Sequence, residues 1–107
     1  MKLLTLNTHS LIEPDYEAKR KIFVDFIARE QPEVFPLQEV NQTAAAPLLG
    51  EIPARYYPCS GNTVLLKADN HAAAEARMLE KQGVQYHWSW LPAKIGYDRY
   101  DEGAAVF

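Results

Sequence analysis

The sequence predicts a small α/β domain, and two observations support this prediction. The first part of the chain alternates an apolar strand, an amphipathic helix and a second apolar strand, which is typical of a parallel crossover unit. The second part adds an alanine-rich helix and two short apolar strands. The expected strands cover residues 2–7, 34–39, 84–90 and 103–107, and the expected helices cover residues 15–30 and 70–82.

Composition limits the classes of function. Of the 107 residues, 48% are hydrophobic and 23% are charged, as in a soluble globular protein. The net charge of −3 gives no overall basic field that would attract nucleic acid. The single cysteine, Cys59, excludes an internal disulfide and fits a reducing compartment. The N-terminal apolar run breaks at Asn7 and no stretch reaches transmembrane length, so we expect a cytoplasmic protein without a membrane segment.

The sequence clearly indicates a strand at residues 2–7 and a helix at residues 15–30. Residues 2–7 read as a strand in which three leucines can pack, followed by the polar residues Asn7, Thr8 and His9. Pro14 and Asp15 suit a helix start, and a proline after residue 30 suits its end. The residues predicted to form the packed face of this helix are Ala18, Ile22, Phe23, Phe26 and Ile27.

The stretch at residues 34–41 organises the predicted domain. Its apolar run brings a carboxylate, Glu39, to the expected strand end, and Asn41 then suits a turn. Ligands of open α/β sheets bind at the carboxyl ends of strands, so a metal-ligand role explains Glu39 better than packing does. A parallel crossover would place Asn7 and Glu39 at the same edge. Pro36 argues for an irregular strand, because proline cannot donate to a sheet ladder.

The sequence from residue 43 onward indicates secondary structure less clearly. Residues 43–69 are broken by prolines and suggest no function, whereas Asn70 and Gly83 suit the two ends of the second helix. Residues 91–102 are expected to form a loop whose Lys94, Tyr97, Arg99, Tyr100 and Glu102 could touch a ligand. The strand begun at residue 103 would end the chain as an unfinished sheet edge. We therefore expect a piece of a longer protein that could self-associate.

Four motifs in order resemble one family. They are LTLN at residues 4–7, LQEV at 37–40, WSWLPAKIGYDRY at 88–100 and YDEG at 100–103. Together they are similar to the endonuclease/exonuclease/phosphatase superfamily of metal-dependent phosphoesterases, and to a small uncharacterised bacterial subgroup within it. The resemblance implies that residues 1–107 are the N-terminal fragment of a single domain with a four-layered α/β/β/α sandwich.

The resemblance also implies roles for individual residues. Glu39 matches the carboxylate that binds the catalytic Mg²⁺ (or Mn²⁺). Asn7 matches the first-strand asparagine that lies in the same metal site and helps order the metal and phosphate. Glu102 matches a glutamate that orients a catalytic histidine in some nuclease members. The Asp-x-Asn element and the C-terminal Asp-His pair that complete the family's site do not occur in these 107 residues.

The sequence thus leaves two hypotheses open. In the first, the parent protein is a metal-dependent hydrolase of phosphodiester or phosphomonoester bonds, with nucleic acid among its candidate substrates. In the second, the chain is a catalytically inactive fragment that acts as a folding or interaction module. A nucleotide-binding module is disfavoured because no glycine-rich loop follows either early strand. His9 could contact substrate or be an ordinary surface histidine, and Cys59 has no assigned role.

Overall fold

A computed structural model of the chain describes residues 1–96 and 98–107. It contains four strands, two α-helices and one 3₁₀-helix. The strands are β1 (Leu6–Asn7), β2 (Pro36–Thr43), β3 (Ser89–Gly96) and β4 (Tyr100–Val106). The helices are η1 (Ser10–Ile12), α1 (Tyr16–Glu30) and α2 (His71–Lys81). The α/β class and both predicted helices are confirmed.

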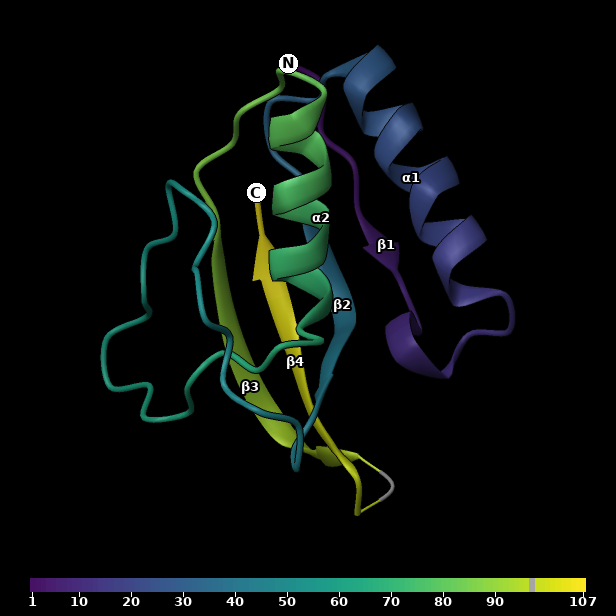
Figure 1. The fold of residues 1–107 in the computed structure, drawn as a ribbon. Helices are drawn as coiled ribbons and strands as arrows, with labels where there is room; N and C mark the ends of the chain where they lie inside the picture. Colours follow the sequence, from purple (N-terminus) through teal and green to yellow (C-terminus); the bar gives the residue numbers. More distant parts are fainter. Residues whose placement is uncertain (97) are drawn as a thin grey trace.

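The four strands form one mixed sheet in the order β1-β2-β4-β3. β1 pairs parallel with β2, as the crossover argument predicts, and β4 is antiparallel to both of its neighbours. Figure 1 shows α2 crossing in front of β2 and β4, with α1 beside β1. Phe23 of α1 packs edge-on against Phe35, just before β2, with ring centroids 6.2 Å apart.

The C-terminal half differs from the prediction. Residues 84–88 are not a strand, although Tyr56 and Trp88 form an isolated bridge. β3 instead runs through part of the expected loop, and its hairpin partner β4 starts at Tyr100 rather than Gly103. β4 lies between β2 and β3, so the expectation that it forms the unfinished edge is wrong. Apolar and polar residues alternate along residues 84–90, which predicted a strand. The alternation instead reflects the packing of Tyr86, Trp88 and Trp90 against the core.

The packed face of α1 also differs from the prediction. Val24 and Ile27 are fully buried, but Ile22 is 69% exposed and Ala18 is exposed. The inward face is centred on Val24 and Ile27, and Phe23 and Phe26 on either side are partly buried against the core. In α2 the predicted stripe is confirmed: Ala72, Ala76 and Leu79 are buried, and Asn70 caps the helix by accepting a hydrogen bond from the Ala73 N–H.

Strand β2 contains a β-bulge. Leu37 pairs with Ala105 and Val40 with Gly103, so β2 has two residues where β4 has one. The expected turn at Asn41 is wrong, because β2 continues to Thr43 and Asn41 is buried. An extra residue in one strand bends it and redirects side chains locally. Glu39 therefore lies in a bulge within β2 and not at its end.

Strand β3 contains a second bulge, opposite Gly103 of β4. Pro92 of β3 pairs with Gly103 and Lys94 with Glu102, so Ala93 is an extra residue. Gly103 thus lies between two bulged strands. A Cβ atom at Gly103 would lie 2.4 Å from the Leu91 carbonyl oxygen and 3.0 Å from the Pro92 Cα. The small side chains of β4 also leave room for Trp90, whose Nε1–H crosses to β2 and donates to the Val40 carbonyl at 2.9 Å.

A buried amide network ties the irregular segment before α2 to the sheet. Gln42 is fully buried, and its Nε2 donates to the Leu65 carbonyl at 3.1 Å and to Asp101 Oδ2 at 2.9 Å. Its Oε1 accepts from the Lys67 N–H at 2.8 Å and from Asn70 Nδ2 at 2.9 Å. Since each polar atom of Gln42 has a partner, its burial carries no unsatisfied group.

The sheet face opposite the helices carries exposed apolar side chains. Leu91 and Val106 are 47% and 49% exposed. Leu6, which is in register with Leu37 and so lies on the helix side of the edge strand β1, is also 41% exposed, so the prediction that Leu6 packs is wrong. Leu3 is 66% exposed, which also contradicts its predicted packing. Within residues 1–96 and 98–107, neither helix is long and apolar enough to span a bilayer.

Substitution of Gly103 by alanine should test the double-bulge arrangement. The added methyl group must displace backbone atoms of β3, so we expect G103A to lower the free energy of unfolding by about 1–3 kcal/mol in urea denaturation. Gly50→Ala is the control, because nothing lies within 4 Å of a Cβ there. Equal stability of the two variants would contradict the described packing.

Candidate functional site

Glu39 takes an unusual backbone conformation. Its φ of 53° is in the left-handed region, which is uncommon for a residue with a side chain. The loop after β1 stabilises this bulge from the side. The Thr8 N–H donates to the Gln38 carbonyl at 2.9 Å, and the Thr8 hydroxyl lies 2.9 Å from the Glu39 carbonyl oxygen. The bulge and this loop together position the Glu39 carboxylate.

The segment from Asn7 to Ser10 folds back onto β2. Asn7 Oδ1 accepts the His9 N–H at 3.2 Å, and Ser10 Oγ accepts the Asn41 N–H at 3.0 Å. His9 and Ser10 both have positive φ, at 52° and 38°. Because the residues on either side of His9 are bonded to β2, its position relative to the bulge is fixed.

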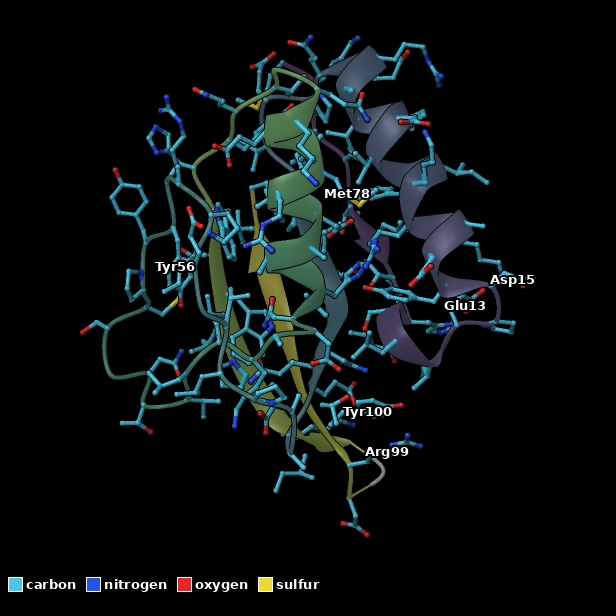
Figure 2. All side chains as sticks on the ribbon, viewed as in Figure 1. Glu13, Asp15, Tyr56, Met78, Arg99 and Tyr100 are labelled. Carbon is cyan, nitrogen blue, oxygen red and sulfur yellow. The ribbon has the colours of Figure 1, made fainter. Side chains whose placement is uncertain are left out.

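The His9 ring lies between two carboxylates. Its Nε2 is 3.4 Å from Glu39 Oε2, and its Nδ1 is 3.1 Å from Glu13 Oε2. Lys19 contacts the other oxygen of Glu13 at 2.6 Å. The hydrogen bonds from Lys19 and then His9 lower the pKa of Glu13 below its ordinary value. Figure 2 shows Glu13 just before α1, on the side of the molecule that carries β1 and η1.

The Glu39 carboxylate has an unsatisfied oxygen. Oε2 is buried and has no hydrogen-bond partner, since the contact with His9 lacks hydrogen-bond geometry. A buried carboxylate oxygen without a partner is costly unless a donor or a cation binds it. Among the described residues, no group of three or more His, Cys, Asp or Glu side chains could hold a metal ion. A cation at Glu39 would therefore need further ligands from amides, water or substrate, which is common for Mg²⁺.

The other predicted contact residues lie on the β3–β4 hairpin. Glu102 pairs in register with Asn41 on β2 and with Lys94 on β3. Lys94 and Arg99 are exposed, and the Arg99 guanidinium lies 5.5 Å from the centroid of the Tyr100 ring. Figure 2 shows Arg99 and Tyr100 together, away from Glu13. The expected contact residue Tyr97 lies outside the described residues.

A cavity of about 170 Å³ adjoins the Asn7–Ser10 segment. It reaches between the N-terminal ends of α1 and α2, where four polar residues gather: Tyr16, Arg20, His71 and Glu75. The Tyr16 hydroxyl lies 2.7 Å from His71 Nδ1 and accepts from Arg20 Nη1 at 3.2 Å. His71 Nε2 lies 3.3 Å from Glu75 Oε1. These contacts join the two helices.

Burial favours the uncharged forms of both His71 and Glu75. Burial, and secondly the nearby Arg20 charge, lower the pKa of His71 to about 3. Burial raises the pKa of Glu75 to about 8, although Arg20 opposes this rise. Neither Glu75 oxygen has a hydrogen-bond partner, and the side chain is fully buried. Burial thus disfavours an ion pair between these residues, although the two atoms are 3.3 Å apart.

Comparison with known proteins finds a solved structure whose fold is similar to that of this chain. The structure is similar to an endonuclease/exonuclease/phosphatase family protein from Leptotrichia buccalis C-1013-b, with a TM-score of 0.80 and 29% sequence identity. The match covers 99% of this chain and 36% of that protein, so the chain spans about a third of that protein's length. No protein-family model and no curated protein matches the sequence. The structural match confirms the resemblance to the endonuclease/exonuclease/phosphatase family that the motifs predict.

Several residues around Asn7 and Glu39 were missed by the sequence interpretation. Glu13 contacts both His9 and Lys19, but Glu13 and Lys19 come from the loop and the helix between the two motifs. Tyr16 and Arg20 were missed because a polar pair at a helix start normally faces solvent. The four-residue spacing of His71 and Glu75, one turn apart on α2, was the one signal that could have pointed to that cluster.

Glu75→Gln should reduce the pH dependence of stability. The raised pKa means that the folded state holds the Glu75 proton more tightly than the unfolded state. Its stabilising contribution is full below about pH 4.5 and is lost as pH rises through about 8, by at most about 1.4 kcal/mol per pH unit. We expect urea denaturation between pH 5 and 9 to show a flatter profile for E75Q than for the wild type. Glu17→Gln, on the exposed side of α1, is the control, and an unchanged E75Q profile would contradict the assignment.

Proposed function

We propose that residues 1–107 form the N-terminal part of a single metal-dependent phosphoesterase domain, and that Glu39 binds its divalent cation, Mg²⁺ or Mn²⁺. The observation that carries this proposal is the buried, unpartnered Oε2 of Glu39, held by a bulge beside the Asn7–His9 segment. Similarity to an endonuclease/exonuclease/phosphatase family protein supports the class of reaction.

Each residue near Glu39 has a proposed task. The bound cation would neutralise charge on the phosphoryl oxygens. Asn7 uses its Oδ1 to fix the His9 backbone, and its amide nitrogen is proposed to donate to a phosphate oxygen. Thr8 holds the bulge that directs Glu39. Glu102, in register with Asn41, is proposed to orient a histidine supplied by another part of the protein.

The substrate is proposed to be a phosphate ester, with nucleic acid as one candidate. The net charge of −3 argues against strong non-specific binding to a phosphate backbone. A bound cation and the exposed Lys94 and Arg99 would therefore have to supply the local attraction. The single cysteine supports the cytoplasm as the proposed location.

A second candidate function is that of an inactive interaction module. The exposed Leu91 and Val106 on β3 and β4 favour it, because exposed apolar side chains on one sheet face suit association with another protein surface or a second copy. Under this alternative, residues 1–107 would show no hydrolysis but would self-associate, which analytical ultracentrifugation can measure.

Glu39→Gln should test the proposed activity. In the protein that contains this chain, we expect E39Q to reduce metal-dependent hydrolysis of bis(p-nitrophenyl) phosphate by more than about 100-fold, since even outer-shell changes at metal sites cost about 10–100-fold. Glu51→Gln, at an exposed position, is the control. Hydrolysis by E39Q at the wild-type rate would exclude the proposed role of Glu39.

A further inference from the structure

His9 is held in one orientation by a chain of charged partners. Lys19 binds one oxygen of Glu13, and the other oxygen lies 3.1 Å from His9 Nδ1. Because Glu13 accepts hydrogen bonds as a carboxylate, the Nδ1–H tautomer of His9 is favoured. This tautomer leaves the Nε2 lone pair directed towards Glu39, at 3.4 Å from Oε2.

We propose that His9 Nε2 and Glu39 Oε2 together ligate one divalent transition-metal cation such as Co²⁺ in preference to Mg²⁺, with Glu13 as a positioning residue. This inference rests on the proposed function, in which Glu39 binds a cation, and it adds the second protein ligand and the metal preference.

The geometry of the two side chains supports shared ligation. Metal bonds to imidazole nitrogen and carboxylate oxygen are each about 2.0–2.2 Å long, so two adjacent ligands of one ion lie about 3.0–3.5 Å apart. The 3.4 Å separation of His9 Nε2 and Glu39 Oε2 falls in this range, and the contact lacks hydrogen-bond geometry. A hydrogen bond between them would be better aligned.

The chemistry of the donor set supports the metal preference. Mg²⁺ favours oxygen ligands, whereas imidazole suits the later divalent metals. A ligating histidine commonly donates its other ring N–H to a carboxylate, which fixes the ring and raises its basicity. Glu13 stands in that position relative to His9.

The backbone holds both donors before any ligand binds. His9 and Glu39 both have positive φ, and Thr8 and Ser10, on either side of His9, are hydrogen-bonded to β2. Such backbone strain persists only where surrounding contacts fix it. The two side chains therefore face each other as a consequence of the fold.

The alternative role for His9 is an ion-pair partner of Glu39 with no metal contact. The two roles predict opposite effects of removing the imidazole. If His9 is only a partner, its loss frees the Glu39 carboxylate, and metal affinity stays the same or rises. If His9 is a ligand, affinity for a transition metal falls while affinity for Mg²⁺ changes little.

Calorimetric titration of the 107-residue chain with CoCl₂ and with MgCl₂ separates these roles. His9→Asn is the main variant, because asparagine tolerates left-handed backbone but is too short to replace the imidazole. We expect H9N to weaken Co²⁺ binding by at least about 10-fold and Mg²⁺ binding by less than about 3-fold. Glu13→Gln should weaken Co²⁺ binding selectively, and His87→Asn, at an exposed histidine, should change neither.

The visible absorption of bound Co²⁺ gives a second readout, since loss of a nitrogen ligand shifts its bands in H9N but not in H87N. Unchanged Co²⁺ affinity and spectrum in H9N, or wild-type protein that binds Co²⁺ no more tightly than Mg²⁺, would overturn the inference.

Glu39→Gln distinguishes this failure from failure of the proposed function. If E39Q loses binding of both metals while H9N loses neither, only the role of His9 is wrong, whereas unchanged binding in E39Q would refute the cation site at Glu39.

Discussion

The bulge in β2 is the constraint on which the candidate site depends. One extra residue between Leu37 and Val40 shifts the register against β4 and places Glu39 at positive φ. Glycine at position 103 admits the close approach of β3, and the Trp90 indole satisfies the Val40 carbonyl beside the bulge. The strain at Glu39 is thus offset by contacts from β3 and β4 and from the loop after β1.

The same bulge explains why the site includes residues from separate parts of the sequence. Thr8, which follows the parallel strand β1, hydrogen-bonds to the bulge. Ser10 hydrogen-bonds to Asn41, which comes after the bulge in β2. These bonds bring His9 to Glu39, and Glu13 and Lys19 follow because α1 begins directly after this loop. Farther in, Tyr16 continues the polar contacts to His71 on α2.

The sequence was sufficient to predict the parts of the fold that depend on local periodicity. The apolar spacing of α2 and the parallel pairing of residues near Asn7 and Glu39 are confirmed. The hairpin β3–β4 was missed because Pro92, Lys94 and Asp98 resemble loop residues. Pro92 and Lys94 lie in β3, an edge strand whose bulge accommodates them, whereas Asp98 lies in the turn before β4. The bulge itself has no local signal in Gln38 and Glu39, since it depends on the register of a strand some 65 residues away.

The placement of Asn7 beside Glu39's strand was predictable from topology, but the contacts of His9 were not. A lone histidine in a loop gives no indication of its neighbours, and its flanking hydrogen bonds are made to β2. The exposed apolar face around Leu91 and Val106 belongs to a chain that spans 36% of the length of the structurally similar protein.

A cation site at Glu39 can be tested by X-ray diffraction from crystals of the protein grown with Mn²⁺, using the anomalous signal of manganese to locate the ion. We expect an anomalous peak within bonding distance of the Glu39 carboxylate, on the side that faces His9. Crystals that contain Mn²⁺ at other sites but show no peak at Glu39 would contradict it.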